Sequence, residues 1–239
     1  MALSSNRRIR RGANVGIWAE AFIKTYQERI NSYRLFEPIP GNSNLLRKRI
    51  DNILGQLVEQ VDVNECALGD AVGELNIHYD REVSTLASIR NKRSEFGVHS
   101  IDLDQTRKVP VSTIDTFLAA DENKLLHLVK IDVEGYEMNV LKGAMNALEG
   151  KRIKNIFFEF GVHQTKNGES LKDFYEFLRG FGFDVYVSAR GPNFFGHARV
   201  DKYSDQLEPG GKSVQMVLAT LEGPDPDYRG PNVVGAPIT

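Results

Sequence analysis

Two glycines flank a short turn near the start of the chain, directly before the first amphipathic segment. The turn reads Gly12-Ala13-Asn14-Val15-Gly16, and Glu37 stands 21 residues after its last glycine. Glycines let a ligand approach the backbone closely, and the first turn of a helix offers N–H groups to it. In nucleotide-binding βαβ units, an acid about 20 residues further on accepts hydrogen bonds from ribose hydroxyls. The spacing therefore indicates a ligand that contains adenosine; a plain turn and a solvated acid are the alternatives.

The glycines also discriminate between two adenosine-containing cofactors. NAD sites follow the pattern Gly-x-Gly-x-x-Gly, but here Asn14 replaces the second glycine and no third glycine follows. This departure favours a methyl donor, S-adenosylmethionine, over a dinucleotide. An NAD-dependent oxidoreductase stays the alternative, and a test for NADH binding would decide it.

Candidate proton acceptors follow two apolar segments in the second half of the chain. Methyl transfer to a hydroxyl requires an aligned donor and acceptor and a group that takes one proton. Asp132 is the first candidate, and Glu134, Glu159 and His163 come after it. A solvated loop histidine and a helix-capping Glu134 are the structural alternatives. Asp132 and Glu134 would also suit Mg²⁺ or Ca²⁺, but two carboxylates alone make a poor site, so we expect no required metal.

Three sequence blocks resemble the FkbM family of S-adenosylmethionine-dependent methyltransferases, and they occur in the family's order. These blocks are Phe36-Glu37-Pro38-Ile39-Pro40-Gly41-Asn42, Asn64-Glu65-Cys66-Ala67-Leu68-Gly69-Asp70 and Val129-Lys130-Ile131-Asp132-Val133-Glu134-Gly135-Tyr136-Glu137. Val111–Phe117 and Phe157–Phe160 are similar to the family too. The resemblance extends from about Gly12 to Leu221.

The resemblance implies positions for the cofactor, S-adenosyl-L-methionine, and an oxygen-directed reaction on a small-molecule or sugar-containing acceptor. The implied cofactor-binding residues are Gly12, Asn14 and Gly16 at the methionine end, Glu37 at the ribose, Ala67, Leu68 and Asp70 around the adenine, and Asp132 at the end of the central strand.

Strand-like and helix-like segments alternate along the chain, a pattern typical of an α/β fold. With the resemblance, it predicts a doubly wound, mostly parallel Rossmann-like sheet of the class I methyltransferase type, with an antiparallel last strand. The predicted strands are 33–36, 61–68, 73–79, 125–133, 153–160, 183–187 and 214–221. The predicted helices are 15–30, one that starts after Asn42 or Ser43, 113–120, 140–148 and one that starts at Ser170. We expect residues 84–108 to form a loop with at most one short strand.

The segment before the glycine turn departs from the family. Family members have an apolar strand ending in an acid there, whereas this chain has Asn6-Arg7-Arg8-Ile9-Arg10-Arg11. Unpaired arginines are costly to bury in the middle of a sheet. One explanation is a replaced or truncated first strand. The other is a non-catalytic or weakly cofactor-binding relative that acts as a binding or scaffold protein.

Length and composition fit one globular domain. The chain has 239 residues, and we expect a single domain over residues 1–221 and a disordered tail over 222–239. The net charge of −2 gives no general attraction to nucleic acid or anionic lipid. The longest apolar runs are far shorter than the ~20 residues of a membrane span. With the single cysteine, Cys66, these features lead us to expect a cytoplasmic protein.

Overall fold

A computed structural model gives the fold of the segments that carry most of these predictions. It describes residues 15–26, 32–54, 61–81, 83, 89, 94–96, 99–101, 103–119, 125–188, 200–204 and 215–222. Gly12, Asn14, the arginine-rich segment 6–11 and residues 223–239 of the expected tail lie outside the described residues. The statements about them therefore stay predictions.

The largest sheet has five strands, in the order β11, β10, β12, β9, β8. Their bounds are Val129–Ile131 for β8, Asn155–Phe160 for β9, Asp184–Ser188 for β10, Val200–Lys202 for β11 and Gln215–Thr220 for β12. β8 and β9 are parallel, whereas β12 is antiparallel to both β9 and β10. The expected antiparallel last strand is thus confirmed.

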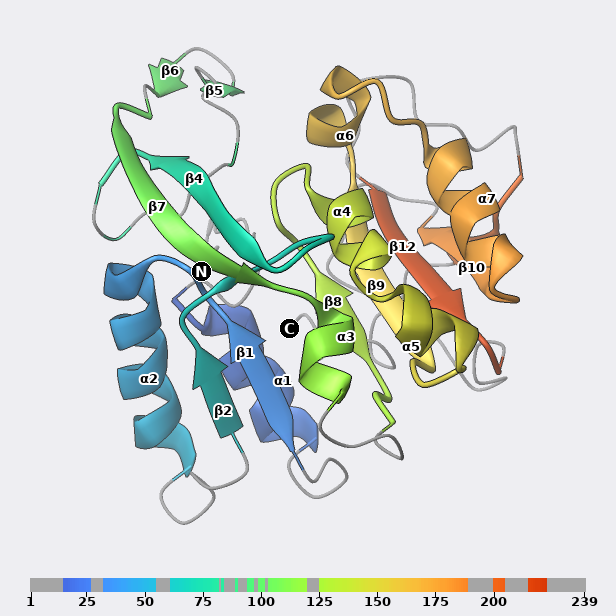
Figure 1. Cartoon of the computed structure of the whole chain (residues 1–239), viewed down its shortest axis with the longest axis horizontal. Helices are drawn as coiled ribbons and strands as arrows, with labels where there is room; N and C mark the ends of the chain where they lie inside the picture. Colours follow the sequence, from blue (N-terminus) through green and yellow to red (C-terminus); the bar gives the residue numbers. More distant parts are fainter. Residues whose placement is uncertain are drawn as a thin grey trace, which may run out of the picture.

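Helices α4 (Glu137–Lys142), α5 (Met145–Glu149) and α7 (Leu171–Gly180) cover one face of this sheet (Figure 1). Their apolar side chains share one core with the inward side chains of β9, β10 and β12. Phe158 of β9 stacks on Phe174 of α7, with ring centroids 5.1 Å apart. Full burial of such a side chain stabilises a fold by about 1.5–3 kcal/mol. The core therefore fixes β9. Helix α6 (Val162–Lys166), which the sequence did not predict, follows this strand.

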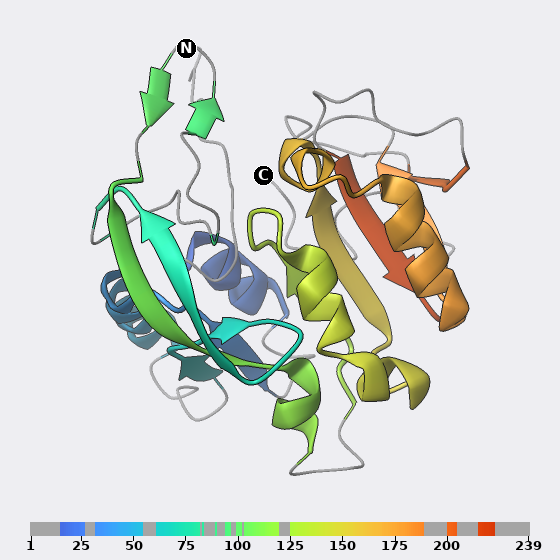
Figure 2. The ribbon, with the colours of Figure 1, turned by 45° about the horizontal axis from the view of Figure 1, so that its top comes forward.

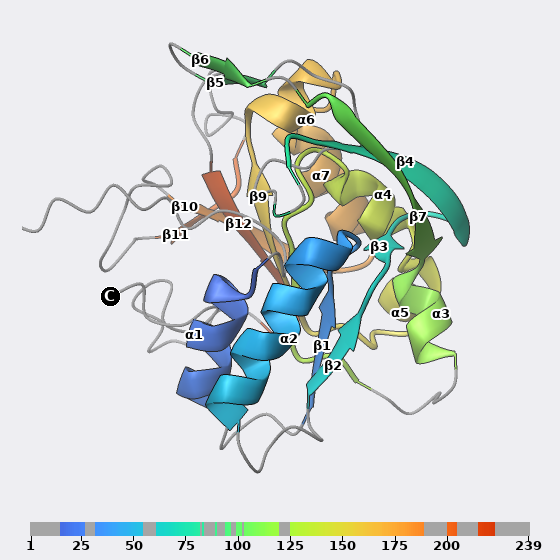
Figure 3. The same cartoon turned by 90° about the vertical axis from the view of Figure 1, so that its left-hand side faces the viewer.

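The amino-terminal elements form a second, smaller layer. Helices α1 (Ile17–Tyr26) and α2 (Pro40–Leu54) lie side by side (Figure 3) and pack on the parallel pair β1 (Tyr33–Phe36) and β2 (Val61–Asn64). Leu128, just before β8, contacts this core and also a second cluster around Phe157 and Leu218 on the five-stranded sheet. The two layers are therefore in direct contact at Leu128.

A third sheet and two short elements complete the described part of the chain. In it, β7 (Gln105–Ser112) lies between β3 (Ala67–Leu68) and β4 (Gly73–Tyr79). Figure 2 shows β4 and β7 as a long twisted pair, and β5 (Ser94–Phe96) with β6 (His99–Ile101) lies beyond its end. Helix α3 (Ile114–Leu118) follows β7 and is capped by Thr113.

Several element predictions are confirmed, and several are wrong for identifiable reasons. The predicted strands 33–36 and 73–79 are β1 and β4, and the Ser170 cap of α7 forms with Asp173 as expected. The predicted strand 61–68 is instead two strands, because β2 pairs with β1 and β3 pairs with β7. The region 84–108, expected to be a loop, contains β5, β6 and the first part of β7. Helix α2 begins at Pro40 rather than after Asn42 or Ser43, because proline suits the first helical position.

The fold is a mixed α/β architecture with small sheets, in which parallel and antiparallel pairs both occur. No helix in the described part of the chain is long and apolar enough to cross a membrane.

Candidate active site

Asp132, the first candidate proton acceptor, lies directly after β8 and is nearly buried. Its Oδ2 accepts a hydrogen bond from the Lys130 ammonium, with a distance of 2.8 Å between Nζ and Oδ2. The side chains point the same way because residues two apart share one face of a strand. The Lys130 ammonium also lies 5.1 Å from the centre of the Trp18 ring. Asp132 is therefore half of an ion pair that joins β8 to α1.

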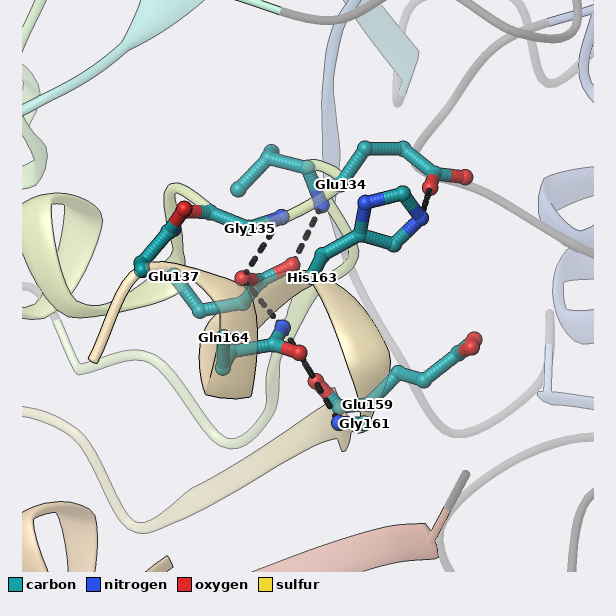
Figure 4. Close-up of polar contacts among 9 residues, drawn as sticks. Glu134, Gly135, Glu137, Glu159, Gly161, His163 and Gln164 are labelled. Carbon is teal, nitrogen blue, oxygen red and sulfur yellow. Dashed lines mark hydrogen bonds and ion pairs between the residues drawn. The ribbon is translucent and has the colours of Figure 1, made fainter. Parts of the chain in front are cut away.

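Glu134, the second candidate, belongs to a tight turn between β8 and α4. Its backbone is left-handed with φ of 57°, and Gly135 has φ of 98°. The left-handed conformation is unusual for a residue with a Cβ atom. It places the Glu134 carboxylate beside the His163 ring, with 2.9 Å between Oε2 and Nε2 (Figure 4). Both side chains are partly exposed, while the Nε2 atom of the His163 ring is itself buried.

The buried carboxyl group of Glu137, the first residue of α4, holds this turn through hydrogen bonds. Glu137 accepts hydrogen bonds from the backbone N–H groups of Val133 and Gly135, each at 3.0 Å. It also accepts one from Gln164 Nε2 at 2.6 Å. Gln164 in turn donates to the Glu159 carbonyl oxygen at 3.0 Å and accepts from the Gly161 N–H at 2.8 Å (Figure 4). One buried network therefore connects the ends of β8 and β9.

The electrostatic environment of Glu137 works in two directions. Burial raises its pKa to about 8, and the nearby Asp132 carboxylate adds to that increase. Hydrogen bonds from the Val133 N–H, from the backbone N–H of Glu137 itself and from Gln164 act in the opposite direction, because they favour the charged form. The pKa of Glu137 is therefore about 8, compared with the ordinary value of 4.5.

Glu159, the third candidate, lies on β9 and contributes its main chain to this network. Its carbonyl oxygen accepts from Gln164, while Figure 4 shows its side chain extending away from the Glu137 carboxyl. Glu134 and His163 are thus the pair that the fold brings into contact among the four predicted proton acceptors.

Glu37, the predicted ribose ligand, lies at the end of β1 and is 6% exposed. Its Oε1 accepts from the Ile39 N–H at 3.0 Å and from Asn42 Nδ2 at 3.2 Å. These bonds orient the carboxylate at the start of α2. A carboxylate at the end of a strand can accept hydrogen bonds from the hydroxyls of a nucleoside.

The Methyltransferase FkbM domain matches residues 11–185 of the chain. The chain belongs to the FkbM methyltransferase family. The expected family resemblance is thereby confirmed, and the match covers the candidate residues from Gly12 to His163. No curated protein matches the chain.

A solved structure of an FkbM methyltransferase, from Methylobacillus flagellatus KT, is similar to this FkbM protein. The TM-score is 0.53 at 14% sequence identity, which shows a shared fold. The match covers 88% of this chain and 42% of the other chain. The FkbM chain described here therefore spans less than half the length of that relative.

The remaining predicted cofactor residues of the FkbM chain lie in two places. Gly16 has φ of 87° and packs against α2, where a Cβ atom would lie 2.6 Å from Leu46 Cδ1. Ala67 is buried and Leu68 is partly buried, both in β3. Asp70 accepts from Asn139 Nδ2 at 3.0 Å and contacts the Tyr136 hydroxyl at 3.5 Å. Asp70 thus joins the end of the second sequence block to the turn of the third.

The sequence patterns of this FkbM protein give no role to Glu137 or Gln164. Glu137 is the last residue of the third family block, and an acid in the first turn of a helix is the signal that points to it. Gln164 lies in α6, a helix that was not expected, and no sequence pattern points to it. Among the described residues, no group of three or more side chains could hold a metal ion.

Proposed function

We propose that the chain is an S-adenosylmethionine-dependent methyltransferase that methylates a hydroxyl group of a small-molecule or sugar-containing acceptor. Membership of the FkbM family supports the methyl transfer. The oxygen preference comes from the family resemblance, and the contact between His163 and Glu134 is the observation that supports it, because a hydroxyl acceptor needs a base to take its proton.

The two sides of the site would have separate tasks. Glu37 would hold the ribose hydroxyls of the cofactor, with Asp70, Ala67 and Leu68 near the adenine. Bound S-adenosylmethionine supplies a methyl group on a sulfonium, which is already activated for transfer. The protein must then hold the acceptor in line and remove one proton.

The proton would go to the His163 imidazole. The acceptor oxygen loses its O–H proton as it is methylated, and the ring becomes an imidazolium ion. The Glu134 carboxylate, 2.9 Å from Nε2, stabilises that positive charge. Asp132 suits this task less well, because a proton on it would weaken its ion pair with Lys130. We therefore prefer the His163–Glu134 pair to Asp132 as the base.

The proposed function fits the expected doubly wound arrangement, with the β1–β2 pair and its helices next to β8. Support comes from the contact of Leu128 with both cores and from the Lys130 ammonium near Trp18 of α1. In such sheets, ligands bind outside the carboxyl ends of the strands. Glu37, Asp132 and Glu134 all follow the carboxyl ends of parallel strands.

The proposed partners and location follow from charge and composition. A net charge of −2 supports a small-molecule or glycan acceptor over nucleic acid or a membrane surface. The single cysteine, Cys66, is free and supports a reducing, cytoplasmic compartment.

Calorimetric titration with S-adenosylhomocysteine tests the cofactor. We expect wild-type protein to bind it and Glu37→Ala to lose binding at least about tenfold, since a charge-assisted hydrogen bond contributes ~1.5–3 kcal/mol. Glu65→Ala, which removes an exposed glutamate just after β2, is the matched control and should bind normally. A folded wild-type protein that does not bind would contradict the proposal and favour the scaffold alternative.

Matched acceptors test the oxygen preference. Pairs of sugars or small molecules that differ only in a hydroxyl or an amine are incubated with the cofactor, and products are identified by mass spectrometry. We expect methylated hydroxyl products; methylation of the amines alone would exclude the oxygen-directed reaction.

A further inference from the structure

We propose that Glu137 and Gln164 are positioning residues that fix Glu134 against His163, an inference that rests on the proposed function. Neither residue reaches the surface: Glu137 is 1% exposed and Gln164 is 3% exposed. Glu137 holds the turn that carries Glu134, and Gln164 holds helix α6, which carries His163.

On one side, Glu137 fixes the turn that carries Glu134. Its two carboxyl oxygens accept the N–H groups of Val133 and Gly135, the residues directly before and after Glu134. A buried N–H group left without an acceptor is destabilising, so both hydrogen bonds hold the turn in this conformation. The network therefore offsets the strain of the left-handed backbone at Glu134.

On the other side, Gln164 fixes the helix that carries His163. Its Oε1 accepts from Gly161 N, the residue before α6, and its Nε2 donates to the Glu159 carbonyl oxygen. The same Nε2 donates to Glu137 at 2.6 Å, and this bond links α6 to the turn around Glu134. Its amide group is thus engaged at both ends, and a shift of α6 would break several bonds together.

Gly135 allows the turn around Glu134 to approach α6 this closely. A Cβ atom there would lie 2.9 Å from His163 Cβ, closer than side chains tolerate. Asn167, just after α6, donates to the Gly135 carbonyl oxygen at 2.7 Å. The contact of Glu134 with His163 is therefore the exposed end of an interface that is polar, buried and closely packed.

Gln164→Met tests the link, because methionine keeps the side-chain length and removes both amide hydrogen-bonding groups. Gln105→Met, at an exposed position of β7, is the matched control. Histidine ring resonances are recorded by NMR at one pH, with His163→Gln to assign the His163 signals. The affinity for S-adenosylhomocysteine and kcat for the hydroxyl acceptor are measured on the same proteins.

We expect Gln164→Met to shift the His163 ring resonances and to lower kcat by about 10- to 100-fold, because small displacements of catalytic groups have effects of this size. The affinity for S-adenosylhomocysteine should change by less than about threefold, since Glu37 lies on other elements. Glu137→Gln should give the same pattern, because an amide cannot accept all three donors. The double variant should be little worse than the more affected single variant.

Unchanged ring resonances and an unchanged kcat in a folded Gln164→Met would overturn the positioning role. An equal loss of cofactor affinity and kcat would overturn it too, because it would indicate general damage. If the wild type binds no cofactor or transfers no methyl group, the proposed function fails, and the His163 resonances still decide the positioning role. If Gln164→Met does not fold, Glu137→Gln provides the same readouts.

Discussion

Asp132 and Glu134 are two residues apart in one sequence block, but their environments differ. The Asp132 carboxylate is nearly buried beside an ammonium group, whereas Glu134 lies in a left-handed turn beside an imidazole. A carboxylate beside a fixed cation is stabilised as an ion, while a carboxylate beside a histidine can stabilise a proton on that ring. The identity of the partner, rather than the acid itself, therefore separates a structural role from the proposed catalytic one.

At this scale we predict the effect of His163→Gln. It should lower kcat by about 10²- to 10⁴-fold, the usual contribution of a general base, with little change in the affinity for S-adenosylhomocysteine. Rates of methyl transfer and titration with S-adenosylhomocysteine check the prediction, with the exposed His127→Gln as the control. An unchanged kcat in His163→Gln would assign the proton to another group.

At the scale of elements, the predicted helix 140–148 shows how tertiary contacts interrupt a regular pattern. Its apolar residues fit a single face, but the structure has α4 and α5 with Gly143 and Ala144 between them. The Gly69 carbonyl oxygen lies where a Cβ atom of Gly143 would be. Asp115 of α3 accepts two N–H groups in the first turn of α5, from Asn146 and Ala147, each at 2.9 Å. The break between α4 and α5 lets Gly69 of the second sequence block and Asp115 of α3 both contact this part of the chain.

Gly143→Ala should therefore be destabilising. We expect a loss of about 1–3 kcal/mol in the free energy of unfolding, typical of an overpacked site, measured by urea denaturation. Gly180→Ala at the end of α7 is the control, because a Cβ atom there meets nothing within 4 Å. The control should be neutral or slightly stabilising. Equal stability of the two variants would mean that the Gly69 turn adapts without cost.

At the scale of the molecule, short contacts join the sequence blocks that resemble the family. The Glu37 N–H donates to the Asn64 carbonyl oxygen at 3.0 Å, and the rings of Phe36 and Phe117 meet edge to face at 4.7 Å. Gly69 lies close enough to Tyr136 that a Cβ atom would come within 3.3 Å of its ring. Blocks far apart in the chain thus form one continuous region around the ends of the parallel strands.

The buried Glu137 makes the stability of the whole molecule depend on pH. Its pKa of about 8 in the folded protein lies above the ordinary value of 4.5. Between these values the folded state binds more protons than the unfolded state, so stability falls as the pH rises. The wild type should lose on the order of 1 kcal/mol per pH unit, relative to Glu137→Gln, from about pH 5 to 8. Urea denaturation of both proteins at three pH values measures this; parallel curves would show that the three N–H donors outweigh burial.

Much of the fold could be predicted because local patterns carried it. Neighbours in the sequence determine the apolar face of α1, which includes Trp18 and Phe22. They also determine the strands β1 and β4 and the Ser170 cap of α7. The split of residues 61–68 into β2 and β3 could not be predicted, because both halves are β-forming and only their different partners separate them. The same applies to β5, β6 and the first part of β7, whose polar residues give no clear alternation.

The sequence by itself determined the family, the α/β pattern and the residues able to do chemistry, because these depend on residue type and spacing. Only the tertiary structure decided which of those residues meet. It brought Glu134 to His163 and joined the turn before α4 to α6 through Glu137 and Gln164. These contacts depend on the parallel register of β8 and β9, which places the ends of two strands side by side. Spacing along the chain carries no such information, because residues brought together by a sheet have no fixed separation in sequence.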